Sequence, residues 1–228
     1  MTINSFVKSL SAYAGESVFN PYSDKCSFYD RHDAPSIRRS NIRNMMNAAL
    51  EGGASTLWVA RDLGYRGGRR TGLALTDEYH LGHLKKMIGS DGFRRATKGP
   101  IVKERTASVI WETLLRIDEP VMLWNVFPFH PHDPEDHMTN RCHTKQERLD
   151  CVPFLESLIE LLNPKKIVAI GRDAAHALEN LSIPVHQARH PSYGGQTTFI
   201  RQIEELYGLL PKAKPARSRQ LLLSPKAT

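Results

Sequence analysis

Short apolar runs alternate along the chain with longer segments in which apolar residues recur every three or four positions. Four runs have the length of buried strands and span residues 56–60, 121–124, 166–170 and 184–188. The periodicity of the other segments predicts amphipathic helices over residues 36–50, 76–88, 103–116, 145–162, 172–181 and 199–209. Strands that alternate with helices are joined by right-handed crossovers, so the pattern predicts an α/β fold in which helices sandwich a mostly parallel sheet.

The first apolar run ends in Arg61 and Asp62 and continues into a loop rich in glycine and arginine, residues 64–72. Ligands of open α/β sheets bind just beyond the carboxyl ends of the strands. Glycines in such a loop let the backbone approach a ligand, and arginines suit phosphate oxygens. Asp62 lies where the strand gives way to this loop and is therefore the first candidate for chemistry.

Two other predicted strands also end in polar residues, the second in Asn125 and the fourth in a segment that contains His190. The carboxyl ends of parallel strands lie on one rim of a sheet. A carboxylate, an amide and an imidazole could therefore converge on one pocket, although each residue taken alone could equally be a loop residue that caps its neighbours.

Composition narrows the class of protein. The chain has 228 residues with a formal net charge of +7, which favours a polyanionic partner such as nucleic acid but also fits a merely soluble basic surface. Its three cysteines, Cys26, Cys142 and Cys151, have no CxxC spacing, which argues against a disulfide framework or a four-cysteine cluster and suits a reducing cytoplasm. We expect no signal peptide and no membrane span.

A single domain is expected over residues 1–210, followed by a basic tail, 211–228, that could add DNA affinity or be a plain disordered end. The segment 127–134 is rich in proline, so regular structure is not expected there. The histidines that follow from His130 to His143 match no familiar zinc spacing, so we predict no metal site and no cofactor. The loop after the first strand lacks the lysine of a P-loop, and no GxGxxG motif follows a strand, which argues against an NTPase and a dinucleotide fold.

With these positions in place, the chain resembles the uracil-DNA glycosylase superfamily. The resemblance rests on the order and spacing of Asn-Pro-Tyr at 20–22, Gly-Tyr-Arg-Gly-Gly-Arg-Arg-Thr-Gly at 64–72, Leu-Trp-Asn-Val-Phe-Pro-Phe-His-Pro at 123–131 and Arg-His-Pro-Ser at 189–192. It implies a three-layer α/β/α sandwich with a central four-stranded, mostly parallel sheet. It also implies a glycosylase that hydrolyses the N-glycosidic bond of uracil flipped out of DNA and leaves an abasic site. The cysteine count excludes the branch with an iron–sulfur cluster.

The family roles fall on particular residues of this chain. Asp62 and His190 take the catalytic positions, and Asn125 takes the position that reads the uracil edge. The segment 60–64, Ala-Arg-Asp-Leu-Gly, departs from the Gly-Glu-Ala-Pro-Gly of many relatives, and Asp62 falls where the most active branch carries its catalytic Asp. Leu75 occupies the position where relatives place an aromatic that stacks on the base, so stacking would come from Tyr65 or Phe127, or the pocket admits a different base.

We expect phosphate and groove contacts from Arg66, Arg69, Arg70, Ser192, Tyr193 and Gly194, with Tyr193 as a possible wedge in the minor groove. The expected partner is uracil-containing DNA, single- or double-stranded, and the expected state is a monomer in the cytoplasm. Two alternatives stay open: a glycosylase for another modified pyrimidine, and a module of the same fold that binds lesions without chemistry.

Overall fold

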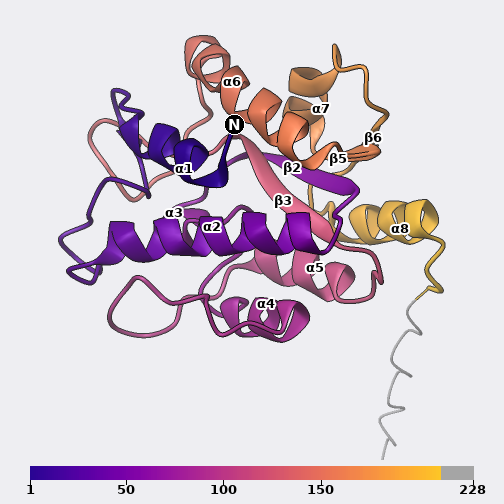
Figure 1. Cartoon of the computed structure of the whole chain (residues 1–228), viewed down its shortest axis with the longest axis horizontal. Helices are drawn as coiled ribbons and strands as arrows, with labels where there is room; N and C mark the ends of the chain where they lie inside the picture. Colours follow the sequence, from indigo (N-terminus) through magenta and orange to yellow (C-terminus); the bar gives the residue numbers. More distant parts are fainter. Residues whose placement is uncertain (212–228) are drawn as a thin grey trace, which may run out of the picture.

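The computed structural model describes residues 1–211 as a three-layer α/β/α sandwich around a parallel four-stranded sheet (Figure 1). The strands lie in the order β3-β2-β5-β6, with bounds Val121–Phe127, Thr56–Asp62, Lys166–Ile170 and Val185–Ala188. All of their pairings are parallel. The four strands expected from the apolar runs are all present, and the sandwich is confirmed. Apart from its first residue, the expected basic tail lies outside the described part of the chain.

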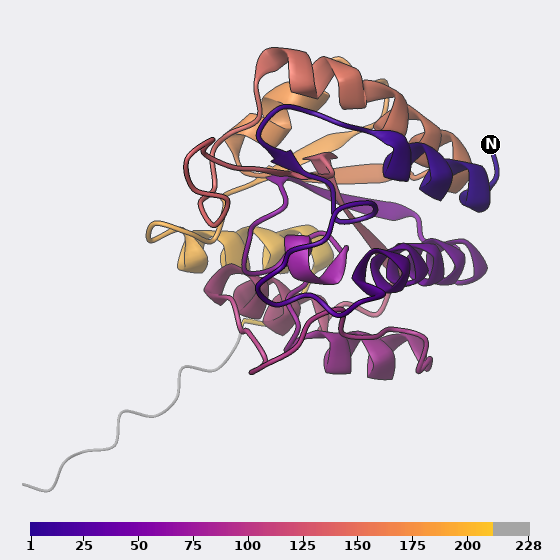
Figure 2. The ribbon, with the colours of Figure 1, turned by 90° about the vertical axis from the view of Figure 1, so that its left-hand side faces the viewer.

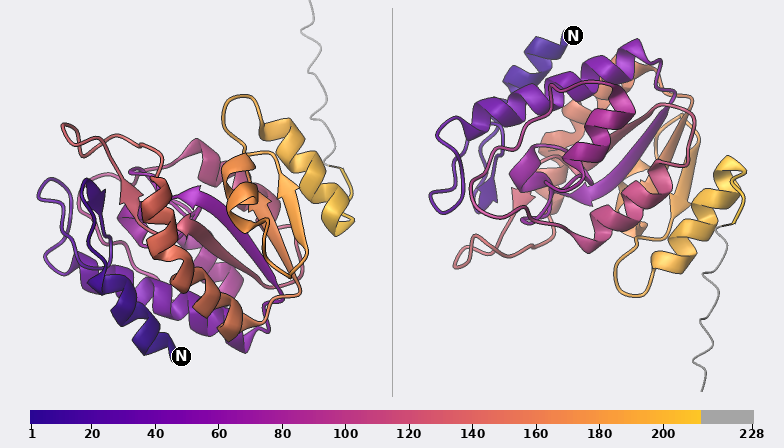
Figure 3. Two further views of the ribbon diagram at one scale, coloured as in Figure 1. Left: turned by 90° about the horizontal axis from the view of Figure 1, so that it is seen from above. Right: turned by 90° about the horizontal axis from the view of Figure 1, so that it is seen from below.

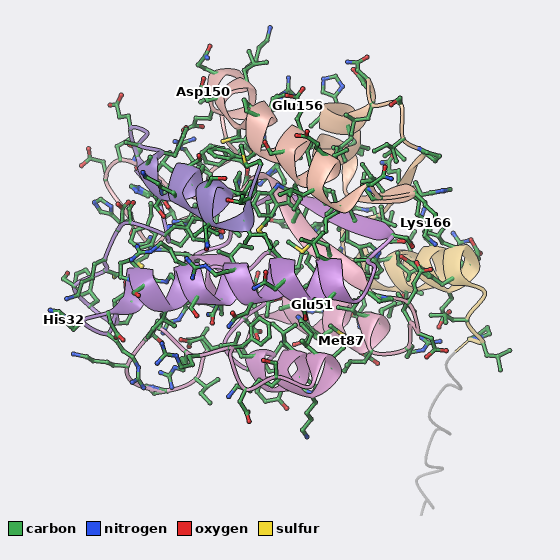
Figure 4. All side chains as sticks on the ribbon, viewed as in Figure 1. His32, Glu51, Met87, Asp150, Glu156 and Lys166 are labelled. Carbon is green, nitrogen blue, oxygen red and sulfur yellow. The ribbon has the colours of Figure 1, made fainter. Side chains whose placement is uncertain are left out.

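Helices cover both faces of the sheet (Figure 2). The helices α6 (Lys145–Leu162) and α7 (Arg172–Leu178) lie on one face, and α2 (Ala34–Glu51), α5 (Arg105–Leu114) and α8 (Gln196–Tyr207) on the other (Figure 3). Two further helices, α1 (Ile3–Ala12) and α4 (Leu81–Ile88), pack outside this frame. The outer surfaces of the helices carry charged side chains such as Asp150 and Glu156 of α6 (Figure 4).

The strands are buried because helices cover them on both sides, which explains their uninterrupted apolar runs. Trp58 of β2, Trp124 of β3 and Trp111 of α5 are all fully buried and fill the layers between sheet and helices. Asp62 is the last residue of β2, but β3 runs two residues beyond Asn125 to Phe127. Asn125 therefore lies within its strand, in register with Ala60, and not at the strand end as expected.

Several helix boundaries differ from the expected ones for local reasons. The helix α2 begins at Ala34, before Ser36, with Asp33 at the N-cap position and a proline in the first turn. The segment 76–80 is a turn and not the start of α4, because the Asp77 carboxylate accepts the backbone N–H of His80 (2.9 Å).

Several short elements were not predicted. The helix α1 is held by a capping box between Thr2 and Ser5, and α3 (Gly68–Thr71) is a single turn within the glycine-rich loop. A two-stranded ribbon pairs β1 (Val18–Phe19) with β4 (His130–Pro131), inside the segment where no regular structure was expected.

Candidate active site

A cavity of about 320 Å³ lies at the carboxyl edge of the sheet, among the loops that follow β2, β5 and β6. Five of the residues singled out from the sequence line it: Asp62, Leu75, His190, Ser192 and Tyr193. The fold thus brings together a carboxylate and an imidazole that lie far apart along the chain. The edge of the sheet expected to carry the chemistry is the edge that holds this cavity.

The Asp62 carboxylate has a partner on either side, Arg61 and His143. Its side chain is 7% exposed, and its Oδ2 lies 2.6 Å from Nε of Arg61. Its Oδ1 accepts a short hydrogen bond from Nδ1 of His143, whose side chain is 9% exposed. Arg61 also reaches Asp173 of α7 (2.8 Å), which ties the end of β2 to the loop after β5. The carboxylate is therefore fixed in orientation at the wall of the cavity.

His190 is oriented by the residue two positions further along the chain. The backbone N–H of Ser192 donates to His190 Nδ1 (3.2 Å), and the Ser192 hydroxyl lies 2.7 Å from the same nitrogen. Nδ1 is thus an acceptor, so the neutral ring carries its proton on Nε2. Burial lowers the pKa of His190 below its usual 6.5, and Arg61 and Arg189 lower it further against the opposing effect of Asp173. The imidazole is therefore a neutral hydrogen-bond donor.

Asn125 does not line the cavity, which corrects the expectation that three polar side chains converge there. Its side chain is buried, and Nδ2 donates to the backbone carbonyl of Asp62 (3.0 Å). Its Oδ1 has no hydrogen-bond partner among residues 1–211. The reason is the register of β3, which places Asn125 beside Ala60 and not beyond the end of the strand. In this position the amide ties β3 to the end of β2.

Two of the three arginines expected to contact phosphate are buried. The guanidinium of Arg69 lies over the ring of Phe19 (4.0 Å) and 3.2 Å from Nδ1 of His130. Arg70 pairs with Glu78 (3.2 Å), whose side chain is fully buried. Both arginines brace the loop from inside, so their expected role as surface phosphate ligands is wrong for the structure as it stands. Arg66 is exposed, as is Gly194.

The two aromatics expected to stack on a base lie outside the cavity lining. Phe127 is fully buried, with its ring 5.6 Å from that of His143. Tyr65 is half-buried, and its backbone N–H donates to Oδ1 of Asn140 (3.0 Å). Burial in the core leaves Phe127 no free face for a base, so that interpretation of Phe127 is wrong.

Backbone strain is concentrated at the cavity. Four non-glycine residues within the described chain have a positive φ, and two of them, Leu75 (φ +55°) and Tyr193 (φ +50°), line the cavity. Such residues cost about 1–3 kcal/mol each and cluster at functional sites. Tyr193 is also 97% exposed, so its ring stands free at the mouth of the cavity.

The sequence did not point to three residues of this site. Arg61 and His143 are partners of Asp62, and Glu104, at the N-cap of α5, lines the cavity. His143 and Asp62 are 81 positions apart, and no spacing rule links them. The available signal was topological, because His143 lies in the connection that leaves the carboxyl end of β3 and leads to α6.

A second and larger cavity, of about 530 Å³, lies beside the β1–β4 ribbon and is lined by Lys25, Arg69, His132 and His137 among others. It contains neither Asp62 nor His190, so the smaller cavity is the better candidate for chemistry. No group of three His, Cys, Asp or Glu side chains in residues 1–211 could hold a metal ion. In the same range, no helix is both long and apolar enough to cross a lipid bilayer.

Comparisons with known proteins bear on the family and on the fold. A family model for the uracil DNA glycosylase superfamily matches residues 62–217. Among solved structures, the chain is similar to the crystal structure of wild-type SMUG2 from Pedobacter heparinus, with a TM-score of 0.59 and 14% sequence identity over 92% of this chain and 98% of that one. No curated protein sequence matches the chain. At 14% identity, the structural likeness supports the fold alone.

Proposed function

Because the chain belongs to the uracil-DNA glycosylase superfamily, we propose that it hydrolyses the N-glycosidic bond of uracil turned out of DNA, releasing the free base and leaving an abasic site. At the level of the family the chain is a DNA glycosylase. The observation that carries the finer proposal is the shared cavity of Asp62 and His190 at the carboxyl edge of the sheet.

The two residues suit the two charges that develop when the bond breaks. The sugar becomes oxocarbenium-like and the base becomes anionic. The Asp62 carboxylate would stabilise the sugar cation and orient the water that attacks the anomeric carbon, taking up a proton from it. The Nε2–H of His190 would donate to the base oxygen on which negative charge accumulates, and a single such donor is worth about 3–4 kcal/mol.

Substrate access requires that the base leaves the duplex. Extrusion costs a few kcal/mol, and the enzyme must recover it from contacts with the DNA. The exposed Arg66 and Tyr193 lie in the two loops beside the cavity. Arg66 would contact a phosphate, and the ring of Tyr193 would act as the wedge. The net charge of +7 favours the approach of a polyanion.

The proposal is tested by alkaline cleavage of a uracil-containing oligonucleotide, single- and double-stranded, after incubation with the protein. We expect cleavage by wild type, loss of at least about 100-fold in Asp62→Asn, and a similar loss in His190→Ala. His186→Ala is the matched control, because His186 lies on the preceding strand and is exposed. Binding without cleavage by the wild type would refute the proposal, and cleavage only of oligonucleotides with another modified pyrimidine would redirect it.

A further inference from the structure

Glu104 places a third carboxyl group in the wall of the cavity, after those of Asp62 and Asp173. It occupies the N-cap of α5, and the first turn of that helix contributes Thr106 and Ala107 to the same wall. The side chain is half-buried. No hydrogen bond or ion pair of this carboxyl group is found within residues 1–211, whereas Asp62 has two.

The glycine-rich turn is shaped around this carboxyl group. A Cβ atom added at Gly67 would lie 2.3 Å from Oε2 of Glu104, and one added at Gly64 would lie 3.6 Å from Oε1. Glycine at this position leaves the space that the carboxyl group of Glu104 fills.

The surroundings of Glu104 shift its pKa upward, so the carboxyl group keeps its proton to a higher pH than a free glutamate does. Burial raises the pKa of Glu104 above its usual 4.5, and the neighbouring Asp77, which accepts the Glu104 backbone N–H (2.6 Å), raises it further. Arg66 opposes this shift. The N-terminal end of α5 also favours a negative charge. An uncharged carboxyl group presents one donor and one acceptor side by side, as an amide does.

Asn125 donates to the backbone of Asp62 and does not reach the cavity lining. Another polar group must therefore bind the hydrogen-bonding edge of the base. We propose that Glu104, as an uncharged carboxylic acid, binds the edge of the extruded base where a carbonyl stands beside an N–H, as O4 and N3–H do in uracil. The acid O–H donates to the base carbonyl, and the acid C=O accepts the N–H. This inference rests on the proposed glycosylase function.

The test compares Glu104→Gln, Glu104→Ala and wild type by kcat/KM on the uracil oligonucleotide between pH 5 and 9. Glutamine keeps a donor and an acceptor at every pH, whereas glutamate loses its donor as the pH rises through its pKa. We therefore expect the ratio of the Gln variant to wild type to increase with pH. The Ala variant has neither group, so it should be about 10- to 100-fold slower than the Gln variant at all pH values. Asp62 and His190 are common to all three proteins, so their titration cancels in the ratio.

A second variant moves the carboxyl group without altering it. In Gly67→Ala, the new methyl group must displace the end of the flexible Glu104 side chain, so we expect a loss close to that of Glu104→Ala. Gly82→Ala on α4 is the matched control, since a Cβ there has no atom within 4 Å. Circular dichroism melting confirms that each variant is folded.

Each other result decides the question. Wild-type activity in Glu104→Ala would overturn the role of Glu104. A Gln variant as poor as the Ala variant, beside a wild type that stays active at alkaline pH, would show that an ionised carboxylate is the acceptor and overturn the neutral acid. A wild type inactive on every uracil substrate would instead refute the proposed function itself.

Discussion

Replacing His143 tests whether Asp62, the carboxylate proposed to be catalytic, depends on a partner that lies outside the cavity lining. Asp62 and His143 are both nearly buried, and Nδ1 of His143 donates to Oδ1 of the carboxylate. A hydrogen bond to a charged group contributes about 1.5–3 kcal/mol. Arg61 still holds the other oxygen when His143 is removed, so the carboxylate loses orientation without being left unpaired. Since about 1.4 kcal/mol corresponds to a factor of ten in rate, we expect His143→Ala to reduce kcat by about 10- to 100-fold.

The assay is single-turnover cleavage of the uracil oligonucleotide at saturating enzyme, with binding followed separately by fluorescence anisotropy. Affinity should change little, because His143 does not line the cavity. His143→Asn keeps an N–H donor near the position of Nδ1 and should stay within a few-fold of wild type. His176→Ala is the control, since that histidine is exposed on α7 and pairs with an exposed Glu179. An Ala variant that cleaves as fast as wild type would refute the reasoning, and so would an Asn variant as slow as the Ala variant.

Three further outcomes follow from the described contacts. Asn125→Asp places a carboxylate against the Asp62 carbonyl in a buried position, so urea denaturation should show a loss of about 3 kcal/mol in unfolding free energy, and unchanged stability would count against the observed hydrogen bond. Tyr193→Ala should reduce cleavage of double-stranded substrate about tenfold more than that of single-stranded substrate, and an equal effect on both would exclude a wedge. Burial and Arg69 lower the pKa of His130 to about 3, whereas the unfolded chain takes up this proton near pH 6.5. Unfolding free energy should therefore fall by up to about 1.4 kcal/mol per unit as the pH drops from 6.5 towards 3, and His130→Gln should flatten this slope; a flat wild-type profile would contradict the burial argument.

The sheet could be predicted from the sequence because its strands are covered on both faces and therefore read as uninterrupted apolar runs. The run from Thr56 and the run from Lys166 start where the strands start. The helix α6 was also predicted at both ends, since it has a capping box at Thr144 and a left-handed residue, Asn163, at its end. The helix α1 has apolar residues at helical spacing, Ile3, Phe6, Val7 and Leu10, and was overlooked, whereas the two residues of β4 are too few to show any repeat.

The sequence could predict only those residues of the site whose positions follow from the ends of strands. Asp62 and His190 meet because parallel strands share an edge, which topology alone implies. The position of Asn125 depends on how far β3 continues, and two residues decide whether the amide faces a ligand or the neighbouring strand. Arginines such as Arg70 look the same in a sequence whether they meet a phosphate or a buried glutamate. Only the packing of the loop distinguishes these cases.

The left-handed backbone at Leu75 and Tyr193 links thermal stability to catalytic activity, so that a change that raises one lowers the other. Glycine at either position would relieve the strain, and at Tyr193, whose side chain is almost fully exposed, it would make the folded chain harder to melt. The same change would remove a wall of the cavity or the ring at its mouth. Selection for heat resistance alone would therefore favour variants that are stable but inactive. A screen for more stable variants must measure base release together with melting temperature.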